Sequence, residues 1–118
     1  MNGDASIVRL NVGGVLYQTT RSTIERYPYF TRLCECLTDP VFIDRDPAHF
    51  RYILNFMRGA TMMPDRKHII AELWVEADYY MLSDYAIQLS RAMSTERDPL
   101  ERLIHAVERL HDQLTYMR

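Results

Sequence analysis

The sequence is poor in the features that mark the most easily recognised protein classes. It has two cysteines and four glycines in 118 residues, and its formal net charge is −2. Proteins that bind nucleic acid usually carry a basic surplus, so this balance argues against nucleic acid as a partner. No apolar run approaches the roughly 20 residues that cross a bilayer, and no basic region precedes an apolar block at the N-terminus. We therefore expect no membrane contact and a cytoplasmic protein, with the nucleus left open as a second compartment.

Residues suited to catalysis or metal binding are also scarce. The four histidines are scattered, and none has ligand spacing with a carboxylate or thiol beside it. Cys34 and Cys36 make a poor disulfide, and Cys-x-Cys without a nearby histidine is a weak metal signal. Gly13 and Gly14 lie between two predicted strands, so they do not form a phosphate loop that opens a helix. The sequence predicts no enzyme, no cofactor and no metal.

The chain does have enough apolar residues for one small domain. Apolar residues make up 47% of the chain, and this length supports one core rather than two. Apolar and polar residues alternate over 7–12, which predicts a half-buried strand. Gly13 and Gly14 suit a two-residue hairpin turn, and residues 15–19 return as the second strand. A short apolar run at 41–43 predicts a third.

Helical patterns fill the rest of the chain up to about residue 93. Four residues are each predicted to cap a helix: Ser22, Asp46, Asp65 and Ser83. Pro47 takes the first position of the helix that Asp46 caps, and Gly59 is a natural helix end. The fold class is therefore α/β (α+β), with a small three-stranded sheet flanked by helices. The residues predicted to face inward are Phe30, Leu33, Cys34, Leu37, Phe50, Ile53, Leu54, Met57, Ile69, Ile70, Leu73, Trp74, Ala77, Tyr80, Met81, Tyr85, Ala86, Leu89 and Met93.

A separate amphipathic helix is predicted at the C-terminus. We divide the chain into a tail at 1–6, a domain at 7–93, a joint at 94–97 and a helix at 98–118. Three heptads of apolar residues run along that helix. We expect this apolar face to be docked on its own domain, bundled between copies or bound to a partner helix. The residues of that face are Leu100, Leu103, Ile104, Val107, Leu110, Leu114 and Met117.

Four segments resemble a T1-type BTB/POZ domain, the tetramerisation module of voltage-gated potassium channels, and most closely the soluble KCTD proteins. They stand in the family's order and spacing, and they are Val8–Gly14, Thr19–Ile24, Phe42–Pro47 and Phe50 with Ile53–Arg58; Glu76–Tyr80 resembles a further segment late in that domain. The resemblance implies a BTB/POZ fold and a homo-oligomeric ring, a tetramer in channels and often a pentamer in the soluble branch. Many soluble members bind the N-terminal part of cullin-3.

The sequence also departs from that family pattern. Many channel T1 domains carry an interfacial zinc site that includes a late Cys-Cys pair, and no such pair follows Tyr80, so we carry over no metal. The resemblance implies a non-enzymatic, homo-oligomerising interaction module that acts as a cullin-3 ubiquitin-ligase adaptor or as an antagonist of one. The alternative is a scaffold that joins T1-type domains and regulates a potassium channel or another partner without cullin.

Candidate oligomer contacts lie between the third strand and the following helix. In the run Asp44, Arg45 and Asp46, one carboxylate can cap the helix while the other groups make charge-assisted hydrogen bonds. Those bonds run either within the chain or to a neighbouring copy, and the residues alone leave both open. We assign these three residues and Asn11 to the oligomer interface.

Candidate partner contacts are aromatic. Tyr80 falls on the apolar stripe of its predicted helix and is expected in the core, whereas Tyr79 falls off that stripe. Tyrosine is enriched at interface hot spots, so we assign Tyr79 to a cullin or other partner contact, and Phe30 with it.

Overall fold

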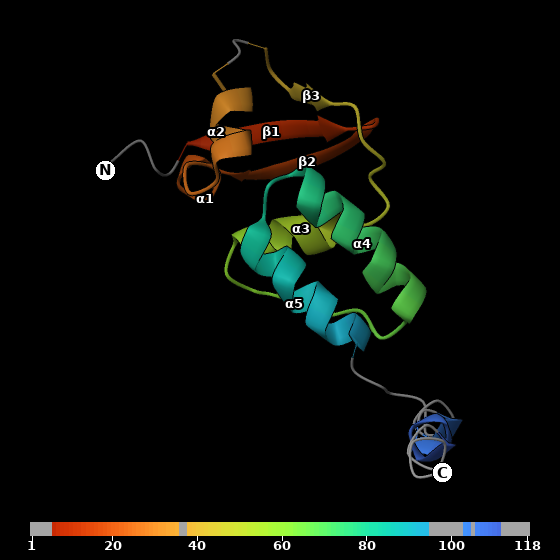
Figure 1. The fold of residues 1–118 in the computed structure, drawn as a ribbon. Coiled ribbons are helices and arrows are strands. Elements are labelled where there is room, and N and C mark those ends of the chain that lie inside the picture. The colour runs from red at the N-terminus through yellow and green to blue at the C-terminus, as the bar shows by residue number, and fades with distance from the viewer. Residues whose placement is uncertain (1–5, 36–37, 95–102, 105, 112–118) are drawn as a thin grey trace.

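The computed structural model describes residues 6–35, 38–94, 103–104 and 106–111. Its centre is a three-stranded sheet in the order β2-β1-β3, drawn in Figure 1. β1 (Ile7–Val12) pairs antiparallel with β2 (Val15–Thr20) and parallel with β3 (Val41–Ile43). The mixed class, the hairpin and the third strand confirm the predicted α+β architecture.

The hairpin turn has the geometry that its two glycines predict. Gly13 and Gly14 have φ angles of 55° and 104°, and positive φ at both central residues belongs to the turn that matches the twist of a hairpin. The side-chain oxygen of Asn11 accepts a hydrogen bond from the Gly14 N–H at 2.8 Å. The Gly13 N–H donates to the carbonyl of Ile43 at 2.9 Å, which ties the turn to the end of β3.

Five helices complete the described part of the domain, and Figure 1 shows the last three gathered on one side of the sheet. They are α1 (Arg21–Ile24), α2 (Pro28–Leu33), α3 (Phe50–Met57), α4 (Lys67–Tyr79) and α5 (Ser83–Ser94). α4 and α5 lie side by side, and both pack over the core. The core residues are Val8, Leu10, Val12, Ile24, Phe30, Val41, Ile43, Phe50, Ile53, Leu54, Met57, Ile70, Leu73, Ala77, Tyr80, Leu82, Tyr85, Leu89 and Ala92.

The first helix is capped by a different residue from the one predicted. Thr20, not Ser22, is the N-cap, and its side chain accepts from the Thr23 N–H at 3.3 Å. Thr20 is the last residue of β2 and keeps an extended backbone, which is the conformation that an N-cap needs. Because β2 ends at Thr20, the hydroxyl of Thr20 rather than that of Ser22 caps the helix.

Two other predicted helix starts are wrong by a few residues. α3 begins at Phe50 rather than Pro47, although Asp46 does accept a backbone hydrogen bond, from Ala48 at 2.9 Å, in the turn before it. α4 begins at Lys67 with Arg66 in the N-cap position, where no side chain caps it, so Asp65 is not the cap.

The link between α4 and α5 overturns one core assignment. Met81 has a positive φ of 62° and is 52% exposed, while its neighbour Leu82 is buried. The left-handed backbone at Met81 redirects the chain after α4. As a result, the side chain of Leu82 points into the core and that of Met81 points to solvent.

The C-terminal helix, by which we mean helical residues 103–104 and 106–111, stands apart from the rest of the domain in Figure 1. Its side chains Leu103, Ile104, Val107 and Leu110 are between 49% and 60% exposed. Leu100, Leu114 and Met117, the other members of the predicted apolar face, lie outside the described residues. In the part of the chain described, no helix is long and apolar enough to span a bilayer.

Candidate interaction surface

The connection between β3 and α3 is held in place by the hairpin turn. The Arg45 N–H donates to the carbonyl of Ile43 at 2.9 Å, the same oxygen that accepts from Gly13. A Cβ at Gly13 would overlap the carbonyl oxygen of Arg45, and it would also lie 3.0 Å from the Pro47 ring. Only glycine therefore lets the turn lie this close, and the turn fixes the backbone from which Arg45 extends.

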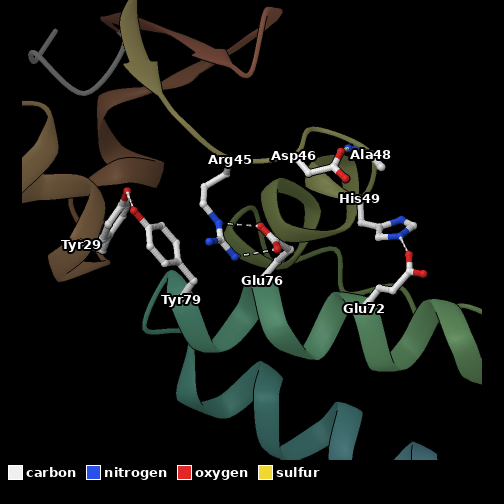
Figure 2. Close-up of polar contacts among 8 residues, drawn as sticks. All are labelled: Tyr29, Arg45, Asp46, Ala48, His49, Glu72, Glu76 and Tyr79. Carbon is white, nitrogen blue, oxygen red and sulfur yellow. Dashed lines mark hydrogen bonds and ion pairs between the residues drawn. The ribbon is translucent and has the colours of Figure 1, made fainter.

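Arg45 forms a two-pronged ion pair with α4. Its Nε donates to Glu76 Oε1 at 3.1 Å and its Nη2 to Oε2 at 2.7 Å, as Figure 2 shows. The two side chains are 26% and 14% exposed, so water screens the pair only partly. The hydrogen bond to Glu76 raises the pKa of Arg45 above its ordinary value, which keeps the guanidinium charged.

Tyr79 completes the arrangement at the end of α4. The Arg45 guanidinium carbon lies 4.0 Å from the centre of the Tyr79 ring, within cation–π range. The Tyr29 hydroxyl, on α2, donates to the Tyr79 hydroxyl at 3.1 Å, and the rings meet at 63°. Burial, with a smaller contribution from that hydrogen bond, raises the pKa of Tyr29. Tyr79 is still 41% exposed, so a partner can reach a ring that is held from two sides.

A second polar pair lies farther along α4, and the sequence analysis missed it. His49 Nε2 lies 2.7 Å from Glu72 Oε1, where Figure 2 shows α4 beside the start of α3. Asp46, Val75 and Glu76 line a hollow of about 300 Å³ together with these two residues. Neither residue belongs to a local motif, so no sequence signal could have joined positions 23 residues apart.

The core beneath Tyr79 contains the aromatic residue that was assigned to a partner. Phe30 has no exposed surface and stacks on Tyr80, with ring centres 5.1 Å apart. The Phe50 ring packs against Phe30 as well. The assignment of Phe30 as a partner contact is therefore wrong, because residues from α3 and the end of α4 cover it. Tyr80 is buried as predicted, and burial raises the pKa of its hydroxyl.

The four predicted interface residues divide into two kinds. Arg45 and Asp46 make the bonds within the chain described above, which was one of the two alternatives. Asn11 also bonds within its own hairpin. Asp44 is exposed, and no polar partner lies near it among the described residues. Asp46 is exposed as well but bonds a backbone N–H, so the carboxylate of Asp44 is the freer of the two.

The surface as a whole presents binding chemistry. Contacts within the chain hold two groups on α4, the Tyr79 ring and the Glu76 carboxylate. They hold two more on the β3–α3 connection, the Arg45 guanidinium and the Asp46 carboxylate. Within the described ranges, no group of three or more histidine, cysteine, aspartate or glutamate side chains converges as metal ligands. The arrangement is suited to hold an aromatic contact and a charge in register for another protein.

Comparison with known proteins finds the BTB/POZ domain over residues 8–90. The chain is similar to the BTB/POZ domain-containing adapter for CUL3-mediated RhoA degradation protein 2 of Xenopus tropicalis, with 36% identity over 103 residues, and of Homo sapiens, with 36% over 100 residues. These matches cover 80% and 77% of the chain. BTB/POZ domain-containing protein KCTD5 of Rattus norvegicus is 30% identical over 133 residues, covering 98% of the chain. The chain spans 32% of the length of the two adapter proteins and 56% of KCTD5.

Proposed function

The chain belongs to the BTB/POZ domain family, and on that premise we propose that it assembles with copies of itself and binds cullin-3 as a non-enzymatic adaptor or antagonist. The observation that carries the cullin proposal is the match to relatives named as adapters for CUL3-mediated degradation. The observation that gives it a site is the exposed, held ring of Tyr79.

Tyr79 suits a partner contact because most of its freedom is already lost. Ordering a side chain on binding costs about 0.5–1.5 kcal/mol, and a side chain already held avoids much of that. The Tyr29 hydroxyl and the Arg45 guanidinium both hold the ring before any partner arrives. Tyrosine and arginine are also the side chains most enriched among binding hot spots.

The experiment is a calorimetric titration of this protein with the purified N-terminal region of cullin-3. We expect Tyr79→Ala to weaken binding by at least about tenfold, equal to about 1.4 kcal/mol. Tyr79→Phe keeps the ring over Arg45 and should bind nearly as well as the wild type. Ile87→Ala, an exposed apolar residue on α5, is the matched control and should not change the affinity.

Two results would overturn parts of this proposal. If the wild type does not bind, the cullin assignment fails and the alternative of a scaffold for T1-type domains is favoured. If Tyr79→Ala binds as tightly as the wild type, the assignment of Tyr79 as the contact fails. Light scattering on each variant keeps loss of binding separate from loss of assembly.

The self-assembly surface that we propose includes Asp44, Arg45, Asp46 and Asn11. Asn11 lies between Leu16 and Phe42 in the strand register, and these apolar neighbours are 62% and 56% exposed. An apolar row flanked by the unpaired carboxylate of Asp44 has the composition of an interface with a polar rim.

Charge reversal tests that surface. Asp44→Lys should lower the mass that light scattering measures at micromolar concentration, and salt should change the mass of the wild type as well. Asp84→Lys, at an exposed position of α5, is the matched control and should leave the mass unchanged. A wild type that runs as a monomer of 14.0 kDa would refute self-assembly.

A further inference from the structure

An open groove runs between the end of α4 and α5. It has a volume of about 370 Å³. Trp74 and Met81 line it from α4 and the link, and Ile87 lines it from α5. Met81 and Ile87 are about half exposed, at 52% and 49%. Small side chains from α5, Ser83, Ala86 and Ser90, also line the groove.

Small residues between larger apolar ones let a second helix approach closely. Ser83, Ala86 and Ser90 recur at three- and four-residue spacing, so they lie along one face of α5. A helix packed there would place its own side chains between Trp74 and Ile87, as ridges fill grooves in packed helices.

The same chain carries an apolar helix face that no other residue of the described ranges covers. Leu103, Ile104, Val107 and Leu110 of the C-terminal helix are all about half exposed or more. An uncovered apolar face of this kind marks a binding surface. Three heptads are marginal as an isolated coiled coil, and the flanking positions lack the complementary charges of a two-stranded zipper.

The chain between the two surfaces is long enough to bring them together. Residues 95–97 separate Ser94, the last residue of α5, from the predicted start of the C-terminal helix at residue 98. An extended chain of that length reaches about 10 Å, which is the distance between the axes of two packed helices. Closing so short a loop costs little entropy, so docking within one chain is favoured over pairing between chains.

We propose that the C-terminal helix packs its apolar face into the α4–α5 groove of its own chain. Val107 and Leu110 then meet Trp74 and Ile87, and the antiparallel course follows from the short connection. The proposal stands independently of cullin binding and of the assembly surface.

The test uses the single tryptophan of the chain, which lines the groove. Val107→Asp places a charge on the apolar face, so the helix should leave the groove and expose the indole of Trp74. We expect a red shift of the emission maximum and a rise of about twofold in acrylamide quenching, because Trp74, which the domain alone buries only partly, loses the helix that covers the rest of it. Arg109→Asp, two residues farther along the same helix, is the matched control and should leave the spectrum unchanged. Equal quenching for Val107→Asp and wild type would overturn the proposal.

A cysteine pair tests whether the contact lies within one chain. Ile87→Cys with Val107→Cys, in a Cys34→Ser, Cys36→Ser background, should oxidise to a linked monomer on a denaturing gel. Ile87→Cys with Arg109→Cys should link far less. A covalent dimer from the first pair would assign the groove to the helix of a second copy and contradict docking within the chain.

Discussion

Two arginine–carboxylate pairs in this protein share one geometry and differ in their surroundings. In both Arg9–Asp39 and Arg45–Glu76, the arginine Nε lies 3.1 Å from one carboxylate oxygen and Nη2 lies 2.7 Å from the other. The side chains of the first pair are 49% and 63% exposed, against 26% and 14% in the second. The distances are therefore no guide to which pair stabilises the protein.

The difference lies in what each charge would face if its partner were removed. Arg9 or Asp39 would face water, which solvates an isolated charge well. Arg45 would be left without its carboxylate over the Tyr79 ring, or Glu76 without its arginine at a mostly buried position, where solvation is poor. Two pairs of equal geometry can thus differ in their effect on stability because only one is shielded from solvent.

The largest expected effect comes from breaking the shielded pair. Glu76→Ala leaves Arg45 without its carboxylate and should lower the free energy of unfolding by about 2 kcal/mol. Urea denaturation measures the change. Glu72→Ala removes the 62% exposed carboxylate one turn earlier on α4 and is the control, with a smaller expected loss. Equal losses would show that the shielding of Glu76 has no energetic weight.

A smaller loss of stability is expected when residue 45 keeps its positive charge but loses the two parallel hydrogen bonds of the guanidinium. Arg45→Lys retains one positive charge but cannot bond both oxygens of Glu76 or stack as well on Tyr79. We expect a loss of about 1 kcal/mol by the same denaturation experiment. Arg9→Lys, at the exposed pair, is the matched control and should leave the midpoint where it is. A loss for Arg9→Lys as large as that for Arg45→Lys would contradict the comparison.

Alkaline pH probes the aromatic side of the shielded pair. The pKa of Tyr29 is raised from 10.0, so the folded state favours the neutral phenol. Its contribution to stability is present below about pH 10 and is lost as the pH rises beyond that value. Tyr29→Phe should therefore lose less stability than wild type when the thermal midpoint is measured above pH 10.

Tyr85 serves as the internal control for that measurement. Burial raises the pKa of Tyr85 to about 12, so its contribution is lost between pH 10 and about 12 in both proteins. Tyr85 lies on α5, away from both ion pairs. If Tyr29→Phe and wild type follow the same curve above pH 10, the hydroxyl of Tyr29 does not contribute as inferred.

The smallest effect belongs to the exposed pair. Arg9 lowers the pKa of Asp39 through its hydrogen bond, but water and salt screen both charges. Asp39→Ala should leave the thermal midpoint unchanged at physiological salt. A clear drop would mean that this pair holds the segment before β3 in place, and the contrast with Arg45–Glu76 would fail.

Local patterns predicted the elements of this fold well. The alternation in 7–12, the Gly13-Gly14 turn and the apolar stripes of the later helices all have short periods that a sequence displays directly. The errors had two sources. Met81 points outward because of a local left-handed backbone at a residue that is not glycine. Phe30 was assigned to a partner although its helical stripe also predicted it to face inward, and the structure buries it.

The candidate site was predicted in its residues but not in its contacts. Arg45, Asp46 and Tyr79 were chosen from their positions in the sequence, and the structure places Arg45 against Tyr79. Glu76, which lies 31 residues from Arg45, was not paired with it in advance, because ion pairs across the fold leave no local pattern. The roles of these residues in assembly and partner binding stay predictions.

The parallel pairing of β3 has a consequence for how the protein folds. β1 and β2 meet across a two-residue turn, so they can pair at once. β3 joins β1 only after the chain has closed a loop from Leu10 to Val41, and such distant pairings form later. The connection that carries Arg45 follows directly after β3. The proposed binding surface is therefore expected to be completed late in folding, and a partner that recognises it would select chains whose folding is finished.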